Sequence, residues 1–109
     1  MTEYQVKQKA KEICKQNKWL YYAPPKTRFQ HSDIFNIADC LIWREEGIIL
    51  VQLTTLSNLS ARRRKIKKIM ENISFSCPTQ IWAYDKTRKV FKIDKYYTLK
   101  NQFQQDQIT

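Results

Sequence analysis

Residues 37–54 read IADCLIWREEGIILVQLT, two apolar runs that flank a short polar turn. Both runs are too short for amphipathic helices and are rich in Ile, Leu, Val and Trp, so we predict two strands that are covered on both faces. Asp39 lies inside this apolar sequence, where a carboxylate is costly to bury unless something compensates for its charge. A bound cation compensates best, which makes Asp39 the first candidate for a functional residue.

The turn of this hairpin decides which residues face one another. A two-residue loop at 45–46 pairs Arg44 with Gly47 and, counting back in register, places Asp39 opposite Gln52. A three-residue loop with Gly47 in the left-handed conformation moves the partner by about one residue. In either register Asp39 faces Gln52 or its neighbour.

Length and charge limit the possible functions. A chain of 109 residues is predicted to form one domain. Lys and Arg total 20 against 10 acidic residues, a formal net charge of +10, which favours a polyanionic partner: nucleic acid first and an anionic membrane surface second. There is no membrane-spanning apolar run and no signal peptide before MTEYQVKQK, so we expect a soluble, cytoplasmic protein without a membrane partner. Three scattered cysteines without zinc-type spacing are predicted to be buried thiols.

The residues before the hairpin predict a helix, a strand and a polar loop. Thr2 and Gln5 form a capping box, and the apolar residues that follow recur at helical spacing. The aromatic run 19–23, WLYYA, predicts the first strand, which ends at Pro24. The polar loop 26–33 leads into the central hairpin and is either a solvated connection or part of a binding site.

A second helix is predicted over residues 57–73, where apolar side chains again recur at helical spacing. Any of Ser57, Asn58 or Ser60 can serve as its N-cap. Its first turns carry six cations, although the helix macrodipole and mutual repulsion disfavour them there. These are Arg62, Arg63, Arg64, Lys65, Lys67 and Lys68. A phosphate-binding surface accounts for this arrangement, and a solvated basic face is the alternative.

The last third of the chain predicts a second hairpin. Residues 79–85 and 89–96 are apolar runs on either side of a polar turn. The tail that follows, 96–109, is polar and is expected to fray.

The resulting order of elements, together with Asp39 at the start of one apolar run and Gln52-Leu53-Thr54 at the end of the next, resembles the PD-(D/E)XK nuclease superfamily. The archaeal Holliday-junction resolvase-like branch is the most similar, and the resemblance covers residues 3–94. It implies an α/β fold with a restriction-endonuclease-like core of order αβββαββ, in which helices flank a central mixed sheet. This nuclease domain would occupy residues 1–95, with the polar tail at 96–109.

The resemblance also implies the chemistry of the site. In the family an aspartate and a glutamate hold one or two divalent metal ions, and a lysine two residues after the glutamate helps to activate the attacking water. Matched residue by residue, Asp39 takes the aspartate position, Gln52 the glutamate position and Thr54 the lysine position. The implied cofactor is Mg2+ or Mn2+ at Asp39 and Gln52, with no small-molecule cofactor.

Two departures from the family motif change these expectations. An amide oxygen in place of a carboxylate can still coordinate a hard cation, but without charge, so metal affinity should be low. Thr54 cannot supply the charge of a lysine, and Arg63 or Lys65 of the following helix are candidates to replace it. The first-helix glutamate of many resolvases is not evident, because Lys7 stands at its place, and Asp33 is a candidate for the missing carboxylate.

Two classes of function are consistent with these residues. One is a metal-dependent DNA endonuclease that hydrolyses phosphodiester bonds, including those of branched DNA. The other is a catalytically inactive DNA-binding module, although such a module has little reason to keep Asp33 and Asp39 beside a phosphate-binding surface. A role on RNA is a third possibility, for which no stacking-platform motif is present. The expected DNA contacts are Arg28, Arg62, Arg63, Arg64, Lys65 and Lys68.

A symmetric homodimer is expected, because cutting both strands or resolving a junction requires two sites related by a twofold axis. The aromatic residues Trp82, Tyr84 and Phe91 would be suitable for the interface or, equally, for the core.

Overall fold

The computed structural model describes residues 1–25, 33–35, 37–72, 77–96 and, for the backbone only, 103–108. These residues form an α/β fold with two α-helices, one short 3-10 helix and six strands. In chain order these are α1 (Glu3–Asn17), β1 (Leu20–Tyr22), β2 (Cys40–Arg44), β3 (Gly47–Thr55), η1 (Leu56–Asn58), α2 (Leu59–Met70), β4 (Thr79–Asp85), β5 (Val90–Tyr96) and β6 (Phe103–Ile108).

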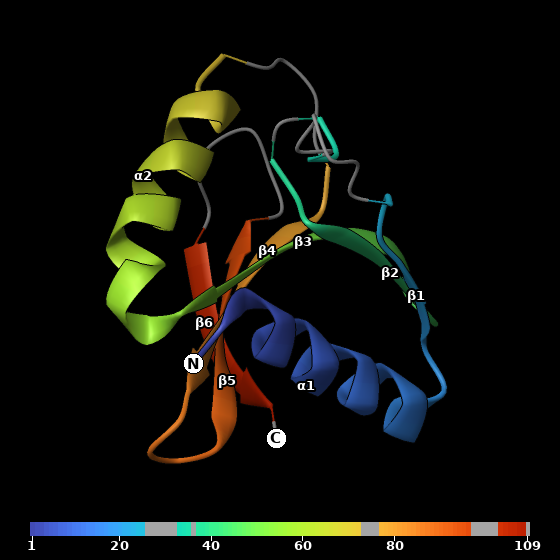
Figure 1. Cartoon of the computed structure of the whole chain (residues 1–109). Coiled ribbons are helices and arrows are strands. Elements are labelled where there is room, and N and C mark those ends of the chain that lie inside the picture. The colour runs from blue at the N-terminus through green and yellow to red at the C-terminus, as the bar shows by residue number, and fades with distance from the viewer. Residues whose placement is uncertain (26–32, 36, 73–76, 97–102, 109) are drawn as a thin grey trace.

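The strands form one mixed sheet in the order of the sequence, β1-β2-β3-β4-β5-β6. Each neighbouring pair is antiparallel except β3 and β4, which are parallel. Parallel neighbours require a crossover connection, and here η1 and α2 supply it. Figure 1 shows α2 on one side of the strongly twisted sheet and α1 crossing in front of it.

The two helices cover opposite faces of the sheet. Along β3, Ile49, Val51 and Leu53 belong to the cluster that packs on α1, whereas Leu50 belongs to the cluster that packs on α2. This alternation follows from the two-residue period of side chains along a strand. All residues from 49 to 54 are buried, so the prediction of a strand covered on both faces is confirmed for β3. It is only partly correct for β2, where Trp43 is 57% exposed.

The register of the central hairpin is the one that a two-residue loop predicts. Arg44 pairs with Gly47, and the pairing continues to Cys40 opposite Val51. Gly47 has a φ angle of 119°, a conformation that residues with a side chain rarely adopt. One residue before β2, the backbone N–H of Asp39 donates to the Val51 carbonyl at 2.9 Å, which fixes Asp39 at the end of the ladder.

One expectation for the C-terminal part needs correction. The segment 96–109 was expected to fray, but residues Phe103–Ile108 pair with Phe91–Tyr96 of β5 and form an edge strand.

Of the two alternatives for the aromatic residues of β4 and β5, the dimer interface and the core, the structure supports the core. The exposed fractions of Trp82, Tyr84 and Phe91 are 0%, 7% and 0%.

The predictions about the cysteines and the membrane have separate outcomes. Cys14 and Cys40 are buried free thiols, as predicted, whereas Cys77 is only partly buried. Within the described ranges, no helix is both long and apolar enough to cross a membrane.

Candidate active site

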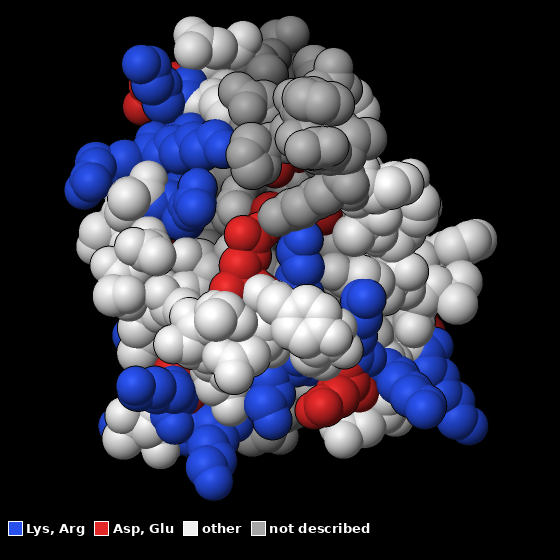
Figure 2. All heavy atoms as spheres, in the orientation of Figure 1, with Lys and Arg blue, Asp and Glu red and all other residues white. Residues whose placement is uncertain are grey.

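A pocket of about 460 Å³ opens between the first turn of α1, the end of β3 and the start of α2, a size that is typical of ligand-binding sites. Three carboxylates line it, those of Glu3, Asp33 and Asp39. Figure 2 shows acidic side chains near the middle of the face in view, beside the basic side chains that lie over α2. In a chain of net charge +10, this concentration of negative charge is a local exception that requires an explanation.

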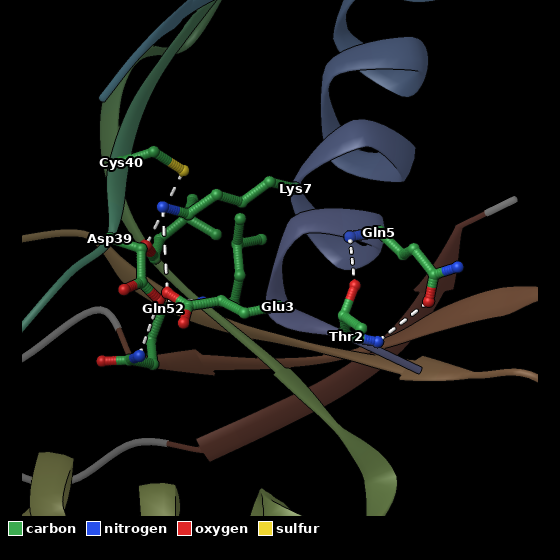
Figure 3. Close-up of polar contacts among 9 residues, drawn as sticks. Thr2, Glu3, Gln5, Lys7, Asp39, Cys40 and Gln52 are labelled. Atoms are coloured by element: carbon green, nitrogen blue, oxygen red, sulfur yellow. Dashed lines mark hydrogen bonds and ion pairs between the residues drawn. The ribbon is translucent and has the colours of Figure 1, made fainter. Parts of the chain in front are cut away.

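Asp39 and Gln52 form the base of the pocket. The Gln52 side-chain amide donates from Nε2 to Asp39 Oδ2 at 2.6 Å, and the backbone N–H of Leu53 donates to the same oxygen at 2.8 Å. Figure 3 shows the two side chains pointing toward each other from neighbouring strands. Because an ionised carboxylate only accepts hydrogen bonds, this contact fixes the orientation of the Gln52 amide. The pairing expected from the two-residue loop is therefore present in the side chains as well.

The same contact leaves two oxygens without a hydrogen-bond partner among the described residues. Gln52 is 3% exposed, and its Oε1 has no hydrogen-bond partner among the described residues. Both bonds to Asp39 use Oδ2, so the other carboxylate oxygen is the one left for the pocket. Leaving a buried acceptor unsatisfied costs about 1–3 kcal/mol, which a ligand would recover. One carboxylate oxygen and one amide oxygen are ligands that Mg2+ accepts, and Mg2+ normally keeps several waters in addition.

The described residues contain no group of three or more Asp, Glu, His or Cys side chains close enough to form a metal cluster. The fit to a metal ion therefore rests on Asp39 together with the amide oxygen of Gln52, with Glu3 and Asp33 farther out in the same pocket.

Burial raises the pKa of the Asp39 carboxyl above its ordinary value, and the charges of Asp33 and Glu3 raise it further. The Leu53 N–H and the Lys7 ammonium act in the opposite direction. A raised pKa means that the ionised form of the Asp39 carboxyl is destabilised in these surroundings, and groups with such shifts are common in functional sites.

Sequence reasoning missed the contribution of α1 to this site. Glu3 lines the pocket, and its Oε1 lies 3.8 Å from the Nζ of Lys7 one turn later. Figure 3 shows both side chains reaching from the helix toward Asp39, while the Thr2–Gln5 capping box fixes the first turn beside them. The only local signal was the i,i+4 spacing of Glu3 and Lys7, which is common on solvated helices.

The opposite wall of the pocket is polar and leads into α2. Thr54 is buried and lines the pocket together with Thr55, Ser57 and Asn58, and Thr55 and Ser57 share a hydrogen bond of 3.0 Å between their hydroxyls. Asn58 is the N-cap residue of α2, as one of the three alternatives predicted, but its side chain makes no capping hydrogen bond in the described structure.

The cations of α2, which were expected to act together on DNA, have different surroundings. Arg62 lines the pocket, whereas Arg63 forms a bidentate ion pair with Asp94, at 2.5 and 3.1 Å. Asp94 is fully buried, so Arg63 has a structural partner that sequence reasoning did not foresee.

Lys65 lies 3.7 Å from Asp33 at the rim of the pocket. Arg64 and Lys68 are exposed, which leaves them accessible to a partner. Arg28, the remaining expected DNA contact, lies outside the described residues.

No family model, no curated protein and no solved structure matches this chain.

Proposed function

We propose that this protein is a metal-dependent endonuclease that hydrolyses phosphodiester bonds in DNA, with Asp39 and Gln52 as the ligands of Mg2+ or Mn2+. The observation that carries the proposal is the buried, unsatisfied Oε1 of Gln52 beside the Asp39 carboxylate, at the base of a pocket that adjoins a basic helix. The resemblance of the strand and helix order to a restriction-endonuclease-like core supports it, although the chain adds a further strand, β6.

The residues of the site are held in place before any ligand arrives. The hydrogen bonds at 2.6 and 2.8 Å fix the Asp39 carboxylate, and the β2–β3 register fixes Gln52 opposite it. Such preorganisation is the main way in which a protein stabilises charge that develops during a reaction. When bound, the divalent ion would supply a Lewis acid for the scissile phosphate and would lower the pKa of a bound water.

Charge distribution supports DNA as the substrate. Arg64 and Lys68 lie on the exposed surface of α2, the helix whose Arg62 lines the pocket that holds the carboxylates. Arginine and lysine on such a surface bind the phosphate backbone without regard to sequence. The protein should therefore bind many DNA forms, branched DNA included, and be selective through shape rather than base contacts.

The alternative, an inactive DNA-binding module, is favoured by Thr54, which offers no charge where the family has lysine. The pocket acids count against it. The ionised side chains of Glu3, Asp33 and Asp39 repel phosphate, so the pocket is unfavourable for DNA binding alone. A metal ion between these carboxylates and the phosphate would reverse the repulsion, which makes the nuclease the better account.

We also propose that two copies act together, because cleaving both strands requires two sites related by symmetry. Among the described residues, an exposed apolar row is formed by Leu20, Trp43 and Ile48, which are cross-strand neighbours on β1, β2 and β3 and are 63%, 57% and 52% exposed. Adjacent apolar side chains with this exposure are typical of an interaction surface.

A cleavage assay tests the nuclease proposal. Linear, nicked and four-way DNA would be incubated with the protein in Mn2+, Mg2+ or EDTA. The parent protein is expected to cleave at least one form only with metal, and Asp39→Asn is expected to abolish cleavage while DNA affinity is kept or increased. Glu46→Gln is the matched control, since Glu46 is an exposed carboxylate at the hairpin turn. If the parent cleaves no DNA form, or Asp39→Asn cleaves as well as the parent, the binding module takes the place of the nuclease.

A further inference from the structure

The proposed nuclease site has no positively charged side chain at the position where the family has its lysine, which is Thr54 in this chain. Thr54 stands two residues after Gln52 and lines the pocket, but a hydroxyl carries no positive charge. During hydrolysis the oxygen of water bonds to phosphorus, the bond to the leaving sugar oxygen breaks, a proton ends on that oxygen, and negative charge spreads over the remaining phosphate oxygens. A positively charged donor beside those oxygens commonly contributes a large share of the rate.

Most basic side chains near the pocket already have partners. Arg63 is bound to the buried carboxylate of Asp94, and Lys65 lies 3.7 Å from Asp33. Lys7 lies 3.8 Å from Glu3 and is not among the residues that line the pocket. Of the two replacements expected from the sequence, Arg63 is therefore engaged on β5, and Lys65 already has a carboxylate partner in Asp33.

Arg62 differs from these three residues. It lies in the first turn of α2, lines the pocket together with Asp39, Gln52 and Thr54, and has no hydrogen-bond or ion-pair partner among the described residues. Consecutive residues of an α-helix point about 100° apart, which explains why Arg62 faces the pocket while Arg63 reaches β5.

The other residues that line the pocket are consistent with a phosphate group beside Arg62. The small side chain of Thr54 leaves room beside Gln52 that a longer residue would fill, and Thr55 and Ser57 add hydroxyls to the same wall. A guanidinium binds phosphate through two parallel hydrogen bonds and keeps its charge at any physiological pH. Gln52, whose Oε1 has no hydrogen-bond partner among the described residues, lines the same pocket and adds an acceptor for a metal ion beside the phosphate.

We propose that Arg62 is the catalytic cation of this site and that, from helix α2, it contacts the scissile phosphate in the place that Thr54 leaves vacant. The inference rests on the proposed nuclease function. It gives the three consecutive arginines different roles, because Arg62 serves the reacting phosphate, Arg63 holds α2 on the sheet, and Arg64 faces the outer surface.

The test compares Arg62→Gln with Arg64→Gln, which removes the same charge from the same helix two residues away. Single-turnover cleavage would be measured at saturating DNA and Mn2+, together with DNA affinity and Mn2+ affinity. Arg62→Gln is expected to lower the cleavage rate constant by about 100-fold or more, the scale of losing one donor to the transition state. Both variants should lose a similar, small amount of DNA affinity, and Mn2+ affinity should stay at the parent value.

Two further variants make the result specific. Arg62→Lys keeps the charge but loses the second hydrogen bond, so its rate should fall between those of the parent and Arg62→Gln. Adding Thr54→Lys to Arg62→Gln should restore at least about tenfold of the lost rate, on the scale of one charge-assisted contact.

The inference is overturned if Arg62→Gln cleaves within about threefold of the parent, a change well below one lost charge-assisted contact. An equal loss of rate in Arg64→Gln would overturn it as well. In either case the parent still cleaves and the nuclease proposal stands. A parent that shows no metal-dependent cleavage overturns both proposals together.

Discussion

Replacement of Arg63 by Ala is expected to destabilise the protein strongly. The Arg63 guanidinium makes two hydrogen bonds to Asp94, whose carboxylate is fully buried on β5. Removing one partner of a buried ion pair typically costs about 3–5 kcal/mol, because a charge is left in a poorly solvated place. The Arg63 side chain is 33% exposed, so water can enter when it is removed, and we expect the lower end of this range, about 3 kcal/mol.

This free energy converts into a measurable change in melting temperature. With an unfolding entropy of about 2.1 cal/mol/K per residue, a chain of 109 residues loses roughly 13 °C for 3 kcal/mol. Thermal unfolding followed by circular dichroism would compare Arg63→Ala with Arg64→Ala, an exposed neighbour expected to stay within about 0.5 kcal/mol of the parent. Adding Asp94→Asn to Arg63→Ala should recover part of the loss by removing the buried charge. Equal melting temperatures for Arg63→Ala and Arg64→Ala would refute a structural role of Arg63.

Four other predictions concern DNA, metal, assembly and pH. With about five phosphates neutralised, log affinity for duplex DNA should change with log salt at a slope near −4.5. The double variant Arg64→Ala, Lys68→Ala should make this slope shallower by about 1.8, and an unchanged slope would place the binding surface elsewhere. Gln52→Glu supplies an anionic ligand, so calorimetry should show tighter Mn2+ binding, with a gain of about 1–3 kcal/mol in binding free energy. Weaker binding would count against Gln52 as a ligand. Light scattering should show a dimer that Trp43→Glu converts to a monomer, and a monomeric parent would contradict the proposed assembly. Burial raises the pKa of the Cys14 thiol to about 11, so the folded state keeps a proton that the unfolded chain loses above about pH 9. The free energy of unfolding should therefore fall between pH 9 and 11, and it should fall less in the Cys14→Ala variant.

The central hairpin and the pairing at its end could be predicted because their causes are local. The length of the loop at 45–46 fixes the register, and the register alone brings Asp39 to Gln52. The edge strand β6 could not be predicted in the same way, because QFQQDQ shows no alternation of apolar and polar residues and pairs through its backbone with β5. Glu3 and Lys7 were missed for a related reason: their place in the site depends on where α1 packs against the sheet, which no local pattern specifies.

The roles within the arginine run were also beyond the sequence. The six cations of residues 62–68 are consistent with one phosphate-binding surface, and only the structure shows that Arg63 reaches from α2 to a buried partner on β5. The partner itself carried a signal: Asp94 lies in the apolar run VFKIDKY, as Asp39 lies in its own run. A carboxylate within such a run needs a compensating charge in both cases. For Asp94 this charge comes from Arg63, within the protein itself.

The contrast between these two carboxylates is the strongest internal argument for a ligand at Asp39. At Asp94 both carboxylate oxygens bind an arginine, so the cost of burying the charge is met inside the fold. At Asp39 one oxygen takes both hydrogen bonds, the amide oxygen of Gln52 beside it has no partner among the described residues, and further acids raise the pKa of the carboxyl. Selection for stability alone would favour hydrogen bonds at Asp39 as complete as those at Asp94. Natural proteins tolerate unsatisfied buried groups chiefly where function uses them. The proposed cation at Asp39 and Gln52 would explain why the chain keeps an incomplete polar site as well as a complete one.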